Sequence, residues 1–167
     1  MEYVEGETLK NYVTHGFGRL NCQQTLDIFM QVMDALRAVH QAGLLHRDIA
    51  PDNIYLCHDG RVKLLDFGEA RYALGAQTQT LVVVKPGFAA EEQYRSNGTQ
   101  GPWTDVYAVA ACMYYCLIGQ APPNVTERVM QDRLQPPHDY GVVMPDEAER
   151  ALLLALSIRA CHRPQSI

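Results

Sequence analysis

A short predicted hairpin between two polar clusters limits how the middle of this chain can fold. The sequence runs HRDIAPDN over residues 46–53, and the strand-like segments NIYL and VKLL then flank CHDGR before DFG begins at Asp66. An Asp-Gly pair between two apolar segments is a strong signal for a β-turn. Because a tight hairpin brings its two ends together, we expect Asp48, Asn53 and Asp66 to converge at one end of it.

The residue types at that end suit the transfer of a phosphoryl group. Asn53 and Asp66 offer an amide and a carboxylate oxygen, and oxygen atoms are the ligands that Mg²⁺ prefers. Asp48 would then orient an attacking hydroxyl group and accept its proton. Phosphoryl transfer needs little more than such positioning and the neutralisation of charge. The three residues therefore form a candidate catalytic site.

The composition is that of an ordinary folded domain in a reducing compartment. At 167 residues the chain can form one domain with one sizeable core. Its net charge of −5 argues against broad electrostatic binding to nucleic acid. Five cysteines without CxxC pairs indicate reduced thiols and no metal cluster. We therefore expect a cytoplasmic domain, which segments outside this chain could anchor to a membrane.

Hydrophobic periodicity predicts a mainly α fold with a small β element. Apolar residues recur on one helical face over 22–42, and Asn21 with Gln24 resembles a capping box at its start. The segment TDVYAVAACMYYCLIG, at about 104–119, is apolar almost all round and predicts a buried helix. Weaker patterns predict helices at about 125–134 and 146–158, and the glycine- and threonine-rich segment 67–94 predicts a long loop.

Taken in order, these motifs resemble the signature of protein kinases. HRD with an asparagine five residues after its aspartate resembles the catalytic loop (46–53), and DFG opens an activation segment (66–92). KPGFAAEEQY resembles the substrate-binding loop and the Ala-Pro-Glu motif, with Glu91 in place of proline. TDVYAVA resembles the buried helix whose aspartate holds the catalytic loop. The similarity covers essentially the whole chain and is closest to bacterial serine/threonine kinases.

The resemblance implies the C-terminal lobe of a kinase that binds ATP with Mg²⁺ or Mn²⁺ and acts on a protein substrate. Asp48 would be the catalytic base, and Asn53 and Asp66 the metal ligands. Residues 1–6 resemble the hinge between the two kinase lobes, with Met1 at the gatekeeper position. The resemblance also assigns Glu2, Val4 and Tyr55 to adenine, and gives structural roles to His46, Arg47, Phe67, Gly68, Glu92, Asp105 and Arg163, with Arg163 as the buried partner of Glu92.

The sequence lacks the parts that kinases keep in their N-terminal lobe. It contains no glycine-rich loop, no strand lysine for the α- and β-phosphates and no partner glutamate on a preceding helix. Its last residues, RPQSI, would begin a helix that does not continue. We therefore expect a fragment, truncated at both ends, that needs the missing lobe as a partner and is inactive alone.

Two positions depart from the serine/threonine kinase pattern and suggest a relocated charge. Ala50 stands where these kinases carry a lysine that reaches the γ-phosphate, and Lys85 stands where they carry a threonine in the substrate-binding loop. The two loops should be neighbours in the folded state, so Lys85 would supply the cation as a second catalytic residue. In the alternative, Lys85 faces solvent and Ala50 has no consequence.

The segment 66–92 also holds candidate sites of regulation. Thr80, and then Thr78, are the expected phosphate acceptors, because a phosphothreonine there could pair with Arg47 and order the loop. In the alternative, both threonines only solvate the loop. The other histidines are expected to be surface or packing residues: His15, His40, His58, His138 and His162.

Two other functions stay open at this point. Ala50 and the altered Ala-Pro-Glu motif favour a pseudokinase or a regulatory binding module, which would bind nucleotide with Mg²⁺ but not turn it over. A kinase-like small-molecule phosphotransferase is the second alternative. Such enzymes usually lack a recognisable substrate-binding loop, and this chain has one.

Overall fold

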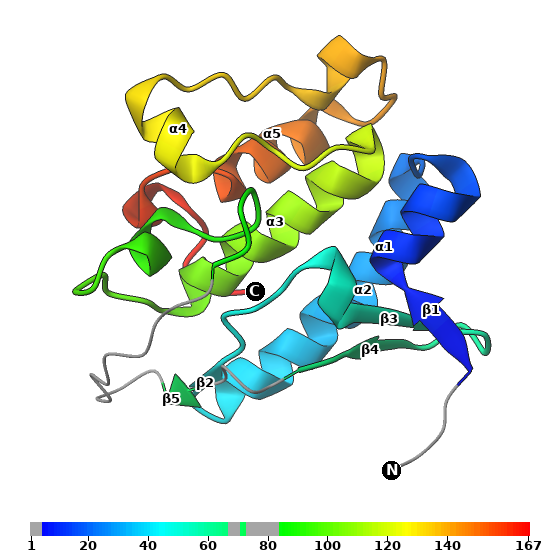
Figure 1. Cartoon of the computed structure of the whole chain (residues 1–167), viewed down its shortest axis with the longest axis horizontal. Helices are drawn as coiled ribbons and strands as arrows, with labels where there is room; N and C mark the ends of the chain where they lie inside the picture. The colour runs from blue at the N-terminus through cyan, green and yellow to red at the C-terminus, as the bar shows by residue number, and fades with distance from the viewer. Residues whose placement is uncertain (1–4, 67–70, 73–83) are drawn as a thin grey trace.

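The computed structural model describes residues 5–66, 71–72 and 84–167, and most of them belong to helices (Figure 1). The strands are β1 (Gly6–Thr8), β2 (Leu44–Leu45), β3 (Ile54–Cys57), β4 (Val62–Leu64) and β5 (Arg71–Tyr72). The helices are α1 (Leu9–Asn11), which a π-helical segment (Tyr12–Phe17) continues, then α2 (Cys22–Gln41), α3 (Pro102–Ile118), α4 (Val125–Met130) and α5 (Asp146–Ala155).

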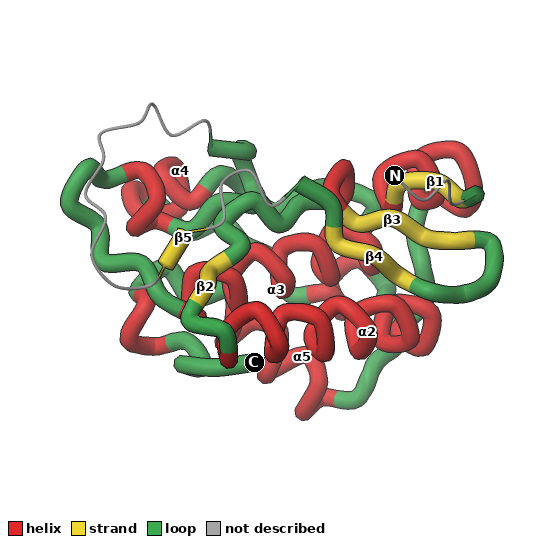
Figure 2. Tube along the Cα trace, turned by 90° about the horizontal axis from the view of Figure 1, so that it is seen from below, coloured by secondary structure: helices red, strands yellow, loops and turns green. Residues whose placement is uncertain are grey.

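The strands form two small antiparallel sheets beside the helices. β1, β3 and β4 make a three-stranded sheet in that order, and β2 pairs with β5. In the helical part, α3 packs against both α2 and α5, while α2 also contacts β4 (Figure 2). This arrangement confirms the predicted mainly α fold with a small β element, and it places the hairpin of β3 and β4 over α2.

The helix α2 forms where the periodicity predicts it, and its start has the predicted capping box. The side chain of Asn21 accepts a hydrogen bond from the backbone N–H of Gln24 at 2.9 Å. The side chain of Gln24 accepts one from the backbone N–H of Asn21 at 3.0 Å. Both orphan donors of the first turn are thereby satisfied. The buried face of the helix is centred on Phe29, Val32 and Leu36.

The helix α3 is the centre of the core, as its continuous apolar sequence predicts. Every residue from Thr104 to Cys112 is buried. One side of the helix joins a cluster with α2, and the other side joins a cluster with α5. The helix ends at Gly119, which has a φ of 81° that favours glycine. A helix held on all sides is a rigid support for any loop that is attached to it.

The predicted hairpin is present, with a turn one residue longer than an Asp-Gly pair alone. Cys57 and Arg61 close the turn through a 2.8 Å hydrogen bond from N–H to carbonyl, so three residues lie between them. Gly60 has a φ of 84°, which is typical of the glycine in a three-residue hairpin loop. The carboxylate of Asp59 accepts the N–H of Arg61 and braces the turn.

Several predicted boundaries were wrong, and one helical segment was missed. The helices α4 and α5 end earlier than the predicted 134 and 158. Just beyond α5, the carbonyls of Ser157 and Ile158 accept hydrogen bonds from the Arg163 side chain. The sequence shows no clear periodicity for the helical segment from Leu9 to Phe17. Within 67–94, the described residues include β5 and a 3₁₀ turn (Glu91–Tyr94) where only a loop was expected.

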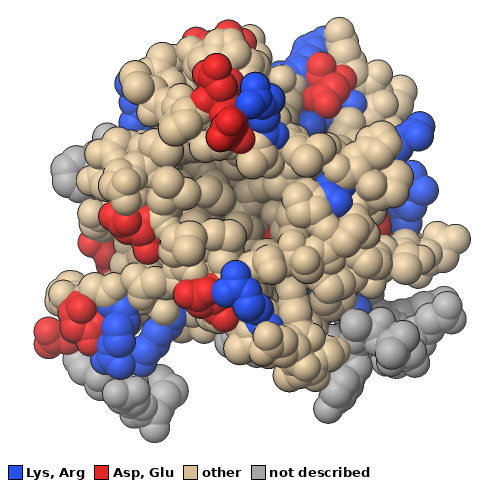
Figure 3. Space-filling model, turned by 180° about the vertical axis from the view of Figure 1, so that it is seen from behind, with Lys and Arg blue, Asp and Glu red and all other residues tan. Residues whose placement is uncertain are grey.

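The face opposite to that of Figure 1 carries a hollow lined by uncharged residues (Figure 3). An apolar cavity of about 310 Å³ lies between α2, α3 and α5, and the last residues of the chain contribute to its wall. Its lining includes Met33, Met113 and Met144. In the described ranges, no helix combines the length and the apolar character needed to cross a membrane.

Candidate active site

The loop that begins at His46 is attached to the core through one buried carboxylate. Asp105, in the first turn of α3, is 0% exposed. Its Oδ2 accepts the backbone N–H of His46, and its Oδ1 accepts that of Arg47, both at 2.9 Å. A buried carboxylate is costly unless it is hydrogen-bonded, and bonds to a charged acceptor are strong. The predicted attachment of the loop to Asp105 is confirmed.

A third contact to Asp105 comes from a residue that was predicted only to pack or face solvent. The Nε2 of His40, in the last turn of α2, lies 2.8 Å from Oδ2 of Asp105. The side chain of His40 is only 10% exposed. Asp105 therefore joins α2, α3 and the loop. No pattern in the sequence around His40 indicates this contact.

Arg47 has a strained backbone and is held at both of its peptide groups. Its φ of 67° lies in the left-handed region, which costs a non-glycine residue about 1–3 kcal/mol. Its N–H donates to Asp105, and its carbonyl accepts a hydrogen bond from Nε2 of Gln93 at 2.8 Å. Strain of this kind persists only where neighbouring groups hold it. Arg47 lies directly before Asp48, so its backbone conformation affects the orientation of Asp48.

Asp48 and Asn53 contact each other within the loop. The Nδ2 of Asn53 donates to the carbonyl of Asp48 at 2.8 Å and to its carboxylate Oδ2 at 2.7 Å. Asn53 is only 8% exposed, so its amide is confined. Because the amide nitrogen faces Asp48, the amide oxygen is directed elsewhere and can serve as a ligand.

The hairpin brings Asp66 to the same end as Asn53. Ile54 pairs with Leu64, and the next backbone contact is a 2.8 Å hydrogen bond from the N–H of Leu65 to the carbonyl of Asn53. Asp66 follows at once, with a φ of 57°. The predicted convergence of Asp48, Asn53 and Asp66 is therefore confirmed, and the exposed carboxylate of Asp66 with the amide oxygen of Asn53 suits a hard cation such as Mg²⁺.

The environment of His46 supports a structural role for this residue. His46 is 0% exposed, and burial lowers the pKa of its imidazole below the ordinary value. The carboxylates of Asp105, Asp48 and Asp66 act in the opposite direction but have the smaller effect. A neutral imidazole packed beneath the loop adds no charge to the site.

Lys85 reaches the carboxylate of Asp48 from the other side of the site. Its Nζ lies 3.1 Å from Oδ2 of Asp48, and the two side chains are 32% and 20% exposed. Both residues line a narrow cleft together with Phe88 and Gln93. Ala50 is 1% exposed, so it is packed and does not face the cleft opening. The predicted proximity of Lys85 and Asp48 is confirmed, whereas the catalytic role of Lys85 stays a prediction.

The turn Glu91–Tyr94 is joined to the residues that follow α5 by a buried ion pair. Both η nitrogens of Arg163 donate to the carboxylate of Glu92 at 2.8 Å. The hydroxyl of Thr104 donates to Glu92 at 2.8 Å as well. The side chains of Arg163 and Glu92 are 0% and 7% exposed. The predicted buried, bidentate pair is confirmed.

The sequence of this chain matches that of known proteins over most of its length. Residues 1–144 match the family described as "Protein kinase domain". The chain belongs to the protein kinase family. Its relatives include the serine/threonine-protein kinase PrkC of Bacillus subtilis, which is 32% identical over 98% of this chain and 26% of the relative. Serine/threonine-protein kinase Pkn1 of Myxococcus xanthus is 33% identical over 100% of this chain and 25% of the relative.

A solved structure supports the same assignment at the level of the fold. PpkA-294 in its apo form is 32% identical and has a TM-score of 0.83, covering 99% of this kinase chain and 58% of its own. The predicted kinase C-lobe-like fold is confirmed. The chain spans about a quarter of the length of the curated relatives that it matches.

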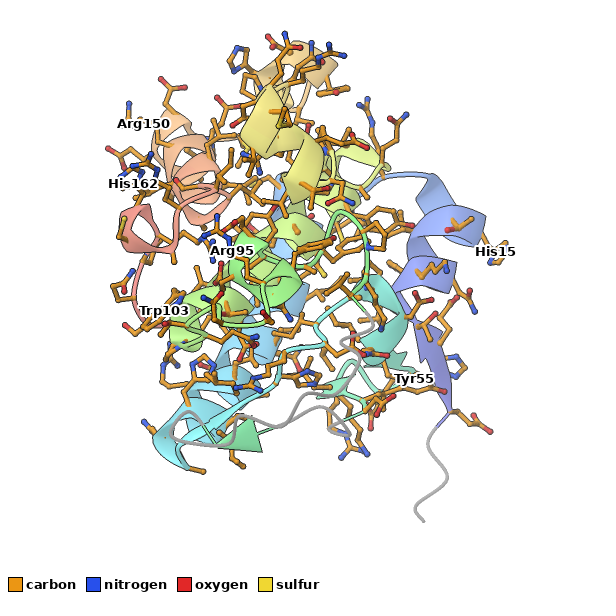
Figure 4. The ribbon with its side chains drawn as sticks, turned by 60° about the vertical axis from the view of Figure 1, so that its left-hand side comes forward. His15, Tyr55, Arg95, Trp103, Arg150 and His162 are labelled. Carbon is orange, nitrogen blue, oxygen red and sulfur yellow. The ribbon has the colours of Figure 1, made fainter. Side chains whose placement is uncertain are left out.

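One predicted site residue, Tyr55, and two histidines that were predicted to be surface or packing residues lie at the margins of the described structure. Tyr55 is on β3, beside the N-terminal strand (Figure 4), where it pairs with Thr8. His15 and His162 lie at opposite outer edges of the molecule (Figure 4). Lying outside the described residues are Met1, Glu2, Val4, Phe67, Gly68, Thr78 and Thr80.

The kinase cysteines offer no alternative metal centre in the part of the chain that the structure describes. In those ranges no group of three or more His, Cys, Asp or Glu side chains could hold a metal ion. Burial raises the pKa of the Cys112 and Cys116 thiols, so both stay protonated and unreactive.

Proposed function

We propose that the protein containing this chain transfers the γ-phosphoryl group of ATP to serine or threonine hydroxyls of a protein substrate. The observation that carries the proposal is the convergence of Asp48, Asn53 and Asp66 at one end of the hairpin, with Lys85 3.1 Å from Asp48. The names of the relatives support the same reaction class.

In this proposal each residue has a separate task. Asp48 orients the attacking hydroxyl group and accepts its proton, while Asn53 keeps its carboxylate in place. Asn53 and Asp66 are the ligands for Mg²⁺ or Mn²⁺, and the bound cation would neutralise charge on the phosphates. Lys85 adds a point charge where the transferred group develops negative charge. Glu2, Val4 and Tyr55 are assigned to the adenine side.

The proposal treats residues 1–167 as a C-terminal kinase lobe, with residues 1–6 as the hinge and 66–92 as the activation segment. The partner is an N-terminal lobe that supplies the other nucleotide contacts, including a lysine to the α- and β-phosphates. In this proposal the domain works in the cytoplasm, and the free cysteines together with the need for ATP support that location. No contact with nucleic acid is required.

We expect the purified full-length protein to transfer label from [γ-³²P]ATP to a generic acceptor protein such as casein. The metal dependence predicts that EDTA reduces transfer to background and that added Mg²⁺ restores it. Residues 1–167 alone should show negligible transfer, because half of the nucleotide contacts are then absent. A full-length protein carrying Asp48→Asn controls for contaminating kinases.

Two outcomes would replace this proposal. Binding of Mg-ATP without transfer to any acceptor would indicate a pseudokinase, which the substitution at Ala50 favours. Transfer to a small molecule but not to protein would indicate a small-molecule phosphotransferase. Clear activity of residues 1–167 alone would contradict the need for a second lobe.

Phosphorylation of the activation segment is the second expectation that follows. We expect phosphate on Thr80, and then on Thr78, in the active full-length enzyme, because a phosphothreonine there could pair with the Arg47 guanidinium. Mass spectrometry of the purified active enzyme, with and without phosphatase treatment, would test this. Active enzyme with neither threonine phosphorylated would contradict it.

A further inference from the structure

Two glutamines in this chain make the same kind of turn contact. The Oε1 of Gln24 accepts the backbone N–H of Asn21 at 3.0 Å, three residues earlier. The Oε1 of Gln93 accepts the backbone N–H of Ala90, again three residues earlier and again at 3.0 Å. Gln93 makes a further contact that crosses to the catalytic loop, because its Nε2 donates to the carbonyl of Arg47 at 2.8 Å.

The carbonyl that Gln93 contacts belongs to the peptide group that joins Arg47 to Asp48. The peptide group is planar, so fixing the direction of the Arg47 carbonyl also fixes the N–H of Asp48. Arg47 has the strained φ of 67°, and Asp105 holds its N–H at 2.9 Å. The strained residue is therefore held from α3 on one side and from the turn Glu91–Tyr94 on the other.

The contact is part-buried, and it is shielded from water mainly on the glutamine side. Gln93 is 6% exposed and Ala90 is 0% exposed. A partly buried carbonyl that loses its protein donor has no other fixed group to hold its direction, because a water molecule that replaces the donor is less constrained. Loss of the Gln93 amide should therefore let the Arg47–Asp48 peptide turn toward a less strained orientation.

The segment that carries Gln93 also carries Lys85. The N–H groups of Phe88 and Ala89 both donate to the carbonyl of Lys85 at 3.0 Å, and the N–H of Gln93 donates to the carbonyl of Ala90 at 3.0 Å. These turns hold Lys85 and Gln93 in one short, hydrogen-bonded segment. Lys85 contacts the carboxylate of Asp48, and Gln93 contacts the backbone immediately before it.

We propose that Gln93 is a positioning residue that sets the orientation of Asp48 through the carbonyl of Arg47. Through this contact, the ordering of residues 85–93 is linked to the active conformation of the catalytic loop. The inference rests on the proposed kinase function, since it assigns a residue that improves the same reaction. Gln93 itself touches no reacting atom.

The test compares Gln93→Glu with wild type and with Gln24→Glu in the full-length enzyme. Glutamate at 93 keeps the acceptor for the Ala90 N–H but turns a carboxylate oxygen toward the Arg47 carbonyl in place of a donor. We expect kcat to fall about tenfold, with KM for ATP changed less than twofold, because the nucleotide contacts are intact. Gln24→Glu, which keeps the corresponding contact in α2, should leave kcat within twofold of wild type.

A second pair of variants separates positioning from a loss of stability. Gln93→Met and Gln24→Met each remove the glutamine contacts while preserving most of the side-chain volume. We expect both to lower Tm, but only Gln93→Met to lower kcat at a temperature where both proteins are folded. Equal kcat values for Gln93→Met, Gln93→Glu and wild type would overturn the proposal.

The remaining outcomes are also decisive. If neither Gln93 variant folds, the residue is structural and the positioning role is wrong. If the wild-type enzyme itself transfers no phosphoryl group from Mg-ATP to protein, the proposed function fails first. An active wild type with unaffected Gln93 variants would leave the kinase function in place and remove only the role of Gln93.

Discussion

Replacing Arg163 by methionine is expected to lower the free energy of unfolding by about 3–5 kcal/mol, because the change leaves the charge of Glu92 buried without its partner. Each of the five N–H donors of Arg163 has an acceptor. Two meet the Glu92 carboxylate at 2.8 Å. The others meet the backbone carbonyls of Ser157, Ile158 and Trp103 at 2.8–3.0 Å. The guanidinium also lies over the ring of Tyr107, 5.0 Å from its centroid.

The location of this ion pair explains why its loss should destabilise parts of the chain that are far apart in sequence. Glu92 lies between Lys85 and Gln93 in the chain, and Arg163 lies beyond α5, so the pair joins parts of the chain that are 71 residues apart. Glu92→Gln should also be destabilising. It leaves the Arg163 guanidinium buried with its three carbonyl acceptors but without a counter-charge.

An exposed ion pair in the same region provides the control. Arg95 pairs with Glu91, one turn along the chain, and the Arg95 side chain is 62% exposed. Arg95→Met should therefore change stability by only about 0–1 kcal/mol. Urea unfolding of the full-length variants, followed by fluorescence of Trp103, would measure the difference, with the denaturant slope as a check on the transition. An Arg163→Met effect no larger than that of Arg95→Met would contradict the expectation.

The parts of the fold that the sequence predicts well are those that local patterns decide. The helix α2 follows from a 3.6-residue repeat and a capping box, α3 from an apolar run, and the hairpin from an Asp-Gly turn. The segment from Leu9 to Phe17 was missed because its burial depends on distant packing. Leu9 and Val13 belong to the core cluster shared with α2 and α3. The backbone just after α5 likewise bonds to Arg163, a residue outside that helix.

The candidate site shows the same division. Asp48, Asn53 and Asp66 could be placed together because a hairpin constrains them. The Glu92–Arg163 pair came only from the resemblance to kinases, since no local pattern joins residues so far apart. His40 and Gln93 were missed because their importance depends on contacts 65 and 46 residues along the chain. Nothing in their immediate sequence distinguishes them from an ordinary helix-end histidine and a turn glutamine.

Replacing Lys85 by methionine is expected to lower kcat of the full-length enzyme at least tenfold, which corresponds to about 1.4 kcal/mol of transition-state stabilisation. Lys85 holds a positive charge 3.1 Å from Oδ2 of Asp48, and both residues line the same cleft. Ala50 cannot supply this charge. A compact ammonium group on a flexible stem suits a phosphoryl group whose charge grows during transfer.

A second lysine with the same ion-pair distance provides the control for this change. Lys10 lies 3.1 Å from Asp52, which is also in the loop 46–53, but the two side chains are 56% and 50% exposed. Solvent screens such a pair, so Lys10→Met should leave kcat within twofold of wild type. Steady-state kinetics at saturating Mg-ATP would compare the two variants directly.

Restoring the charge at position 50 tests whether the cation has been relocated. Adding Ala50→Lys to Lys85→Met should recover part of the lost kcat, because the ammonium group would then approach from the catalytic loop. The recovery should be incomplete. Ala50 is 1% exposed, and a lysine stem there must leave a packed position before its charge reaches the cleft. If Lys85→Met behaves like Lys10→Met, Lys85 is only a partner of the Asp48 carboxylate and the charge has not moved between the loops.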